Sequence, residues 1–313
     1  MEINAESFDK VLSKKYSSNK EKTSSKSKSS KYEYHFDPII AHQSGIIDGS
    51  NLKSGHVVTQ NNRGYQMSTL SPLYNNWINH KELNNYPIVD IGCAYGVNTL
   101  SALFKDNIPH VIAVDMTQSH LDYIKQAHKT YINEGYGHKQ NSKVDTFIGI
   151  LPQLEGFKDE TISSILCAEV IHFLNGNELP IAFQRFYDVL IKGGELNLTC
   201  ASANAYTKDG IDIKKAVDER KKIDPNNKWP GYFDGDDLKQ FLKQVHSKWD
   251  APSDEVARAS DPSMLHFFTA SQIAQLAENA GFLVKSIVTG RHDGYPTAVL
   301  SSHSSIQLVA IKL

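Results

Sequence analysis

Short apolar runs alternate with amphipathic stretches from residue 87 onward, and this rhythm predicts a doubly wound α/β sheet. Ile88–Ile91, which contains one acid, Asp90, and Val111–Val114 are short apolar runs, as expected of parallel strands buried on both faces. Similar runs predict strands at Val144–Ile150, Thr161–Ala168, Glu195–Cys200, Phe282–Val288 and Ile306–Lys312. Apolar residues three and four positions apart predict helices at Asn98–Phe104, Ser119–Asn133, Leu179–Leu190 and Thr269–Ala280.

Glycine, proline and capping residues indicate where these elements end. Thr269 or Ser271 is a suitable N-cap for the last helix, and Gly281 is suited to the position after its end. Gly193–Gly194 predicts a turn before the fifth strand. A loop without a helix joins the last two predicted strands, so we expect the last strand to be antiparallel.

The same pattern divides the chain into a tail, a core and an insertion. Residues 1–31 form a Lys/Ser-rich tail, with seven lysines, eight serines and one acid between Ser13 and Lys31. Such a segment is expected to be disordered and solvated, or to act as a basic arm on anionic lipid or nucleic acid. Residues 32–203 and 264–313 form the core. Residues 204–263 are polar and aromatic, and predict a mainly helical cap over the ligand edge or an inert elaboration.

Composition narrows the classes of partner. The 313 residues carry a net charge of −2, so no overall field attracts nucleic acid, which we do not expect as a partner. The three cysteines have no metal-ligand spacing, which favours reduced thiols, a cytoplasmic location and no bound metal. No apolar run is long enough to span a membrane. We expect a small-molecule substrate, and a homodimer is left open.

The first predicted strand leads into the stretch with the most chemical information, Asp90-x-Gly92-x-Ala94-x-Gly96. Glycines allow the backbone to approach a ligand, and the next helix N-terminus presents free N–H groups. An acid beside the loop repels pyrophosphate but binds an ammonium group. Asp115, after the second strand, is suited to ribose hydroxyls. These features favour S-adenosylmethionine (SAM) as the cofactor, with a dinucleotide site or a ligand-free turn as alternatives.

Three motifs resemble the plant-type SABATH carboxyl methyltransferases and the related bacterial fatty-acid O-methyltransferases. Asp90-Ile-Gly-Cys-Ala-Tyr-Gly-Val-Asn-Thr-Leu is similar to the family's first motif. Cys167-Ala-Glu-Val-Ile-His-Phe-Leu resembles Ser-Ser-x-Ser-Leu-His-Trp-Leu, and the run from Asn61 to Leu70 resembles an N-terminal Gly-Ser-Tyr-x-x-Asn-Ser. The resemblance implies a class I SAM-methyltransferase fold, Rossmann-like, with seven strands and an inserted cap. It also implies O-methylation of a fatty or aromatic carboxylate.

The resemblance assigns roles to individual residues. Asp90 would bind the ammonium group, Asp115 the ribose, and Tyr65 would close over the cofactor. The remaining residues expected at the cofactor are Gly92, Gly96, Asn98, Met116, Gly149, Ile150 and Cys167. The resemblance places His172 and Phe173 at the substrate, and the aromatic composition of the predicted cap adds Trp229.

Other positions depart from the family and leave the acceptor open. Phe173 replaces a tryptophan, Pro72 replaces a carboxylate-binding glutamine, and Glu169 replaces a neutral residue. His172 and Glu169 are the candidate catalytic residues; His172 would orient the substrate, act as a base, or be structural. A carboxylate is already ionised at neutral pH and needs no base. The alternatives are a protein- or RNA-directed methyltransferase that docks through the tail, and a SAM-binding protein without catalysis.

Overall fold

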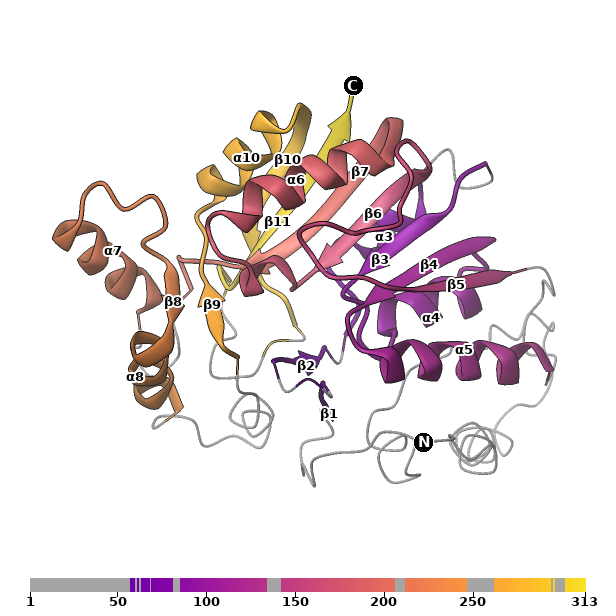
Figure 1. Ribbon diagram of the computed structural model, residues 1–313, viewed down its shortest axis with the longest axis horizontal. Helices are drawn as coiled ribbons and strands as arrows, with labels where there is room; N and C mark the ends of the chain where they lie inside the picture. The colour runs from indigo at the N-terminus through magenta and orange to yellow at the C-terminus, as the bar shows by residue number, and fades with distance from the viewer. Residues whose placement is uncertain are drawn as a thin grey trace, which may run out of the picture.

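The computed structural model describes residues 57–59, 61, 63–67, 69–80, 85–133, 142–205, 212–246, 262–293, 295 and 302–313. The expectation of a disordered tail at residues 1–31 lies outside these residues. Within them the chain folds around one mixed sheet with helices on both faces (Figure 1).

Seven strands form the sheet, and the predicted fold class is confirmed. In spatial order they are β10 (Phe282–Gly290), β11 (Ser305–Lys312), β7 (Leu190–Ala201), β6 (Ile162–Ala168), β3 (Ile88–Ile91), β4 (His110–Asp115) and β5 (Lys143–Ile148). Neighbouring strands from β7 to β5 pair in parallel. β11 is antiparallel to both β7 and β10, as its direct connection to β10 predicts.

The predicted turn at Gly193–Gly194 is wrong. Both glycines lie inside β7, which continues from Leu190 to Ala201. The register with β6 shifts between Ile162 and Ser164, and Gly193 has a φ of 79°. Glycine therefore supplies a bulge in one long strand, because it adopts this backbone conformation without steric cost.

Helices cover the two faces of the sheet in separate layers (Figure 1). One layer contains α3 (Tyr74–Ile78), α4 (Val97–Phe104) and α5 (Gln118–Asn133). The other contains α6 (Glu178–Val189) and α10 (Ala270–Asn279). Thr269 caps α10 with Gln272 in a reciprocal capping box, and Gly281 follows its end with a φ of 100°, as predicted.

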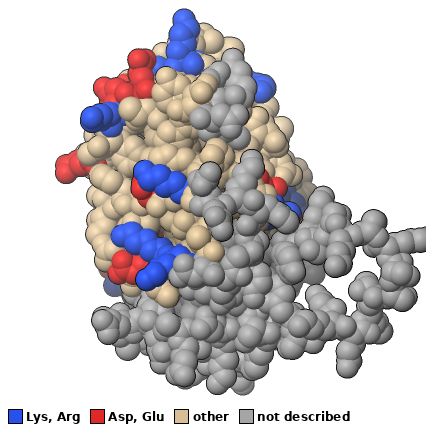
Figure 2. Space-filling model, turned by 90° about the vertical axis from the view of Figure 1, so that its right-hand side faces the viewer, with Lys and Arg blue, Asp and Glu red and all other residues tan. Residues whose placement is uncertain are grey.

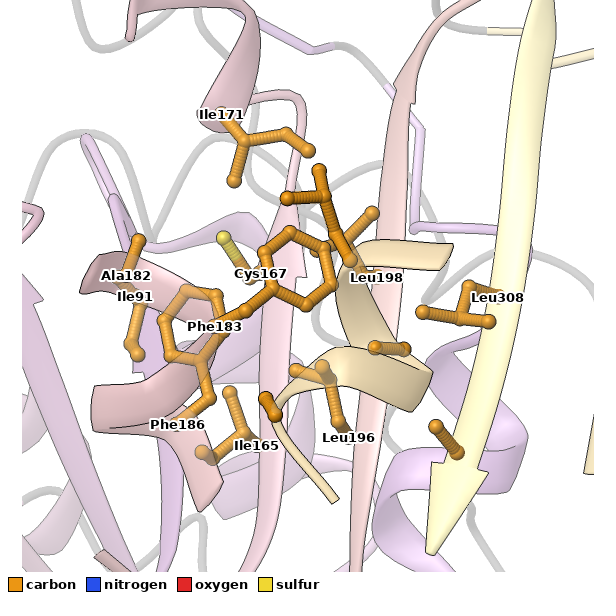
Figure 3. Close-up of a cluster of buried hydrophobic side chains, with 14 of the residues drawn as sticks. Ile91, Ile165, Cys167, Ile171, Ala182, Phe183, Phe186, Leu196, Leu198 and Leu308 are labelled. Carbon is orange, nitrogen blue, oxygen red and sulfur yellow. The ribbon is translucent and has the colours of Figure 1, made fainter. Parts of the chain in front are cut away.

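The larger core cluster lies between α6, α10 and the sheet (Figure 3). Phe183 and Phe186 extend from α6 toward Leu196 and Leu198 of β7, and all four are fully buried. Buried residues recur along α6 at the spacing of one helix face, which explains why this segment forms a helix here. The packed sheet provides a rigid base for the loops at its carboxyl edge.

The insertion between β7 and α10 has a small core of its own. Its described elements are α7 (Ile213–Ile223), β8 (Tyr232–Asp234), α8 (Gly235–His246) and β9 (Met264–His266). The cap is mainly helical, as expected, but it also contains an antiparallel pair of strands, β8 and β9. β9 begins at Met264, one residue after the boundary expected at residue 263, and pairs with β8.

The described surface has no single dominant charge on the face in Figure 2, where basic and acidic side chains are intermingled. Cys93, Cys167 and Cys200 are free and buried. No helix in the described part of the chain is long and apolar enough to cross a membrane.

Candidate active site

A cavity of about 410 Å³ opens at the carboxyl ends of β3, β4 and β6. Its wall includes the glycine loop after β3, the turn after β4 and the loop after β6. The short hairpin of β1 (Val57–Val58) and β2 (Tyr65–Gln66) contributes to the wall from the other side. In parallel α/β sheets this edge is where ligands bind.

Glycines shape the loop between β3 and α4. Gly92 has a φ of 71°, and a Cβ atom there would lie 2.3 Å from Val170 in the loop after β6. The Gly92 N–H donates to the Val114 carbonyl at 2.8 Å, which ties the loop to β4. Gly96 has a φ of 84°, but a Cβ atom there would meet Ile124 of α5. Gly92 therefore lines the cavity, whereas Gly96 allows α4 and α5 to pack closely.

Asp90 is a buried carboxyl at the end of β3. Only 2 % of the residue is exposed, and Thr99 of α4 donates a hydroxyl hydrogen bond to it at 2.7 Å. Burial raises the pKa of Asp90 to about 7, although the bonds from Thr99 act in the opposite direction. Ionised Asp90 is therefore costly in the free protein, and a bound cation would offset that cost.

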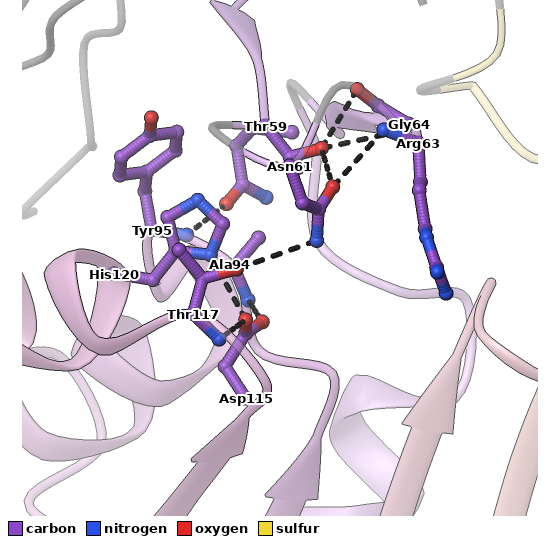
Figure 4. A network of polar contacts seen from close by, with 10 residues as sticks. Thr59, Asn61, Arg63, Gly64, Ala94, Tyr95, Asp115, Thr117 and His120 are labelled. Atoms are coloured by element: carbon purple, nitrogen blue, oxygen red, sulfur yellow. Dashed lines mark hydrogen bonds and ion pairs between the residues drawn. The ribbon is translucent and has the colours of Figure 1, made fainter. Parts of the chain in front are cut away.

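Asp115 lies at the end of the neighbouring strand, in the network drawn in Figure 4. Its carboxylate accepts the N–H of Ala94 at 2.9 Å and the N–H of Thr117 at 2.8 Å. His120 Nδ1 lies 3.0 Å from it. These bonds fix its orientation at the cavity wall, while a carboxylate retains further lone pairs for a ligand.

The β1–β2 hairpin is joined to both loops by side-chain hydrogen bonds (Figure 4). Gln66 accepts the N–H of Tyr95 in the glycine loop at 2.8 Å. Asn61 donates to the Thr117 hydroxyl at 3.3 Å. This arrangement brings Tyr65 to the wall of the cavity.

A second buried carboxyl, Glu169, lies in the loop after β6. Tyr295 donates its hydroxyl to Glu169 Oε2, and Ser305 donates to Oε1 at 3.4 Å. Burial raises the pKa of Glu169 to about 7, and these hydrogen bonds oppose the rise. Glu169 therefore titrates near neutrality.

His172 lies beside Glu169 in the 3₁₀ helix η1 (Ile171–Phe173). Its Nδ1 is 3.6 Å from Glu169 Oε2 and has no hydrogen-bond partner. Burial, followed by the nearby His266, lowers the pKa of His172 to about 3. His172 is therefore neutral at physiological pH and is a weak base.

The structure brings most of the predicted site residues to one cavity. Those that line it are Tyr65, Asp90, Gly92, Asn98, Asp115, Met116, Gly149, Ile150, Glu169, His172 and Phe173. Asn98 also accepts the Ser71 N–H at 3.0 Å, which joins α4 to the segment before α3.

Three predicted residues do not line the cavity. Gly96 faces α5, as described above, and Cys167 is fully buried in the core. The ring of Trp229 packs against Gly176 and lies edge-on to His266 at 5.2 Å between centroids. In this structure all three pack against other parts of the protein, and their expected roles at the ligand stay predictions.

Sequence reasoning missed several residues of the wall. Tyr295 and His292 lie between β10 and β11, and their rings stack with centroids 5.3 Å apart. Arg63 reaches the wall from the hairpin. No periodicity or motif distinguishes these positions in the sequence. The Tyr295 hydroxyl and the Arg63 guanidinium could be assigned to the cavity only once the three-dimensional positions of their loops were known.

The charges of the described lining are unequal. Asp90, Asp115, Glu169 and Glu178 provide carboxyl groups, whereas Arg63 provides a guanidinium. This composition is suited to a cationic ligand. Among the residues that the structure describes, no group of three or more His, Cys, Asp or Glu residues is placed to hold a metal ion.

A family model described as a methyltransferase domain matches residues 88–194, which include β3, β4, β5, β6 and the loops at the cavity. The chain is also similar to the solved structure of a SAM-dependent methyltransferase from Methanosarcina mazei, at 18 % identity and a TM-score of 0.54. That match covers 78 % of this chain and 98 % of the other. It confirms the class I methyltransferase fold.

Two other solved structures are also similar to the chain. A putative SAM-dependent methyltransferase from Listeria monocytogenes is 11 % identical, with a TM-score of 0.46 and coverage of 77 % of this chain and 96 % of that one. A geranyl diphosphate C-methyltransferase from Streptomyces coelicolor is 11 % identical, with a TM-score of 0.47 and coverage of 77 % and 78 %. No curated protein sequence matches the chain. The predicted enzyme class, a SAM-dependent methyltransferase, is confirmed, while the role of each site residue stays a prediction.

Proposed function

We propose that this methyltransferase domain binds SAM between Asp90 and Asp115 and methylates a small molecule held in the same cavity. The observation that carries the proposal is the pair of buried carboxyls at the ends of adjacent strands, on either side of the Gly92 loop. Bound SAM would supply an electrophilic methyl group on a sulfonium.

The residues present fit that cofactor. Asp90 would receive the ammonium group, whose positive charge offsets the cost of ionising a buried carboxyl. Asp115, held by Ala94 and Thr117, would accept the ribose hydroxyls. Met116 is 39 % exposed and Ile150 is 53 % exposed at the cavity edge, so both offer apolar surface to an adenine ring.

A carboxylate acceptor of the SABATH kind is a second candidate. Arg63 favours it, because a guanidinium at the cavity wall can pair with a carboxylate. Glu169 and Glu178 in the same lining oppose it through like-charge repulsion. A cytoplasmic location, the absence of a nucleic-acid partner and the open homodimer stay predictions.

Isothermal titration calorimetry with SAM and with NAD tests the cofactor, and methyl-labelled SAM with a panel of small molecules tests turnover. We expect micromolar or tighter binding of SAM, no binding of NAD, and labelled small-molecule product. Removal of residues 1–31 should leave that turnover unchanged, whereas methylation of a protein or RNA would fall without the tail. A folded protein that does not bind SAM would overturn the proposal.

A further inference from the structure

Glu169 is held in an unusual backbone conformation at the end of β6. Its φ is 61°, a region that non-glycine residues rarely adopt, and its N–H donates to the Thr199 carbonyl at 2.9 Å. Strained residues of this kind cluster at functional sites. The conformation places a carboxyl that is 7 % exposed at the wall of the cavity.

The segment between β10 and β11 and the start of β11 hold that carboxyl from the opposite side. Tyr295 donates to Oε2, and Ser305, the first residue of β11, lies within 3.4 Å of Oε1. Burial raises the pKa of Tyr295 well above its ordinary value, so its hydroxyl keeps its proton and remains a donor. Tyr295 therefore orients Glu169 and stabilises its anion.

His172 presents a polar atom that the protein itself leaves without a partner. Its Nδ1 is buried, has no hydrogen-bond partner and is 3.6 Å from Glu169 Oε2, which is too far for a direct hydrogen bond. A buried nitrogen without a partner costs about 1–3 kcal/mol. A ligand hydroxyl bound between the two groups could accept a hydrogen bond from His172 Nδ1 and donate its own hydrogen to Glu169 Oε2.

From this geometry we propose that Glu169 is the general base, that His172 binds the acceptor oxygen, and that the acceptor is a hydroxyl-bearing small molecule. Tyr295 is a positioning residue for Glu169. The inference rests on the proposed function, because Glu169 acts only if a methyl donor occupies the same cavity.

The proposed step balances in atoms and charge. The hydroxyl proton moves to Glu169, and the oxygen lone pair forms a bond to the methyl carbon as the carbon–sulfur bond breaks. The bonding electrons stay on sulfur, so the sulfonium becomes a neutral thioether and Glu169 becomes a neutral acid. A carboxylate acceptor has no proton for Glu169 to take, and its charge would face a second carboxylate at low dielectric.

The titratable side chains that surround Glu169 do not change protonation near neutral pH, whereas Glu169 does. His172 from η1 is neutral because burial lowers its pKa to about 3. Burial likewise raises the pKa of the thiols of Cys167 and Cys200 on β6 and β7, which remain protonated. Tyr295 is protonated as well. Asp90 has a pKa of about 7 as well, but the ammonium group of bound SAM would hold it ionised. At saturating SAM, ionisation of Glu169, whose pKa is about 7, should therefore set the acid limb of turnover.

The test uses the full chain with methyl-labelled SAM and matched pairs of compounds that differ only in carrying a hydroxyl or a carboxyl group. We expect product from hydroxyl compounds, and a loss in kcat of roughly 100-fold or more for Glu169→Gln, as for loss of a general base. SAM affinity by calorimetry should stay within twofold. Glu155→Gln, an exposed carboxyl on the surface, is the matched control and should behave as the wild type.

Tyr295→Phe separates positioning from a structural role. Loss of the hydroxyl bond destabilises the Glu169 anion, so the acid limb of kcat/KM should move up by at least half a pH unit. Hydroxyl compounds should also bind the complex with S-adenosylhomocysteine more weakly in His172→Ala, measured by calorimetry without turnover.

Several results would overturn the inference while leaving the proposed function intact. These are product from carboxyl compounds alone, kcat within threefold of wild type for Glu169→Gln, an unmoved acid limb in Tyr295→Phe, or SAM binding with no hydroxyl compound bound or methylated. Failure of the wild type to bind SAM would instead overturn the proposed function.

Discussion

Replacing Asp90 with asparagine should stabilise the protein while it weakens cofactor binding. Asparagine has nearly the same shape, and its carbonyl oxygen can still accept the Thr99 hydroxyl bond. It removes a carboxyl that is 2 % exposed and whose ionisation the fold opposes. The two effects have opposite signs, so they can be separated in one variant.

The size of the stabilisation follows from the pKa of Asp90, which rises from 3.8 to about 7 on folding. At about 1.4 kcal/mol per pH unit, ionised Asp90 costs the folded state about 4 kcal/mol. Because folding raises the pKa of Asp90, the folded state favours the neutral carboxyl. The unfolding free energy of the wild type therefore falls as the pH rises from about 4 to about 7, and above pH 7 this loss is complete.

The assay is urea unfolding of wild type and Asp90→Asn at pH 5, 6, 7 and 8 without cofactor. The difference in unfolding free energy should grow with pH and then level off near 4 kcal/mol above pH 7. Glu169 titrates in the same range but is present in both proteins, so the difference isolates Asp90. Asp122→Asn, which removes an exposed carboxyl on α5, is the matched control for the same substitution outside the core.

A difference that does not change between pH 5 and 8 would refute the reasoning, because desolvation could not then be the cause. Calorimetry with SAM at pH 8 should also show at least a tenfold loss of affinity in Asp90→Asn, or about 1.4 kcal/mol. Unchanged affinity would remove Asp90 from the ammonium site.

Three further predictions test the cavity and its surroundings. Asp115→Ala should weaken SAM binding at least tenfold, or about 1.4 kcal/mol, in calorimetry of protein shown to be folded by circular dichroism; equal affinity would contradict the ribose assignment. His172→Ala should lower kcat more than SAM affinity in steady-state assays, and equal losses would show that it serves the fold. Gly176→Ala should destabilise the protein by about 1–3 kcal/mol in urea, since the new Cβ would lie 2.1 Å from Trp229, while SAM affinity stays unchanged.

The sheet could be predicted from the sequence because buried parallel strands leave continuous apolar runs. Ile88–Ile91 begins and ends at the predicted residues, and the antiparallel last strand followed from its direct connection. The glycine pair at 193 was misread because the same residue type serves turns and bulges. Whether these glycines form a turn or a bulge depends on their pairing with the neighbouring strand, β6, which is distant in sequence.

The cofactor half of the candidate site was more predictable than the acceptor half. Asp90 and Asp115 lie at or near the carboxyl ends of short apolar strands, so their position at one sheet edge could be inferred from chain order. Tyr295 reaches Glu169 across 126 positions in the chain, and no local pattern marks that meeting. Trp229 was assigned to the substrate from composition alone, whereas its ring packs against Gly176 and His266.

The position of β11 between β7 and β10 has a consequence for the order of folding. β7 and β10 have no hydrogen-bonded partner in common except this strand, so β10 cannot join the sheet until residues through Lys312 have been synthesised. The Tyr295 and Ser305 contacts to Glu169 arrive with the same segment. The acceptor side of the cavity can therefore form only after the β10–β11 segment has been translated, which is later than translation of the loops that would hold the cofactor.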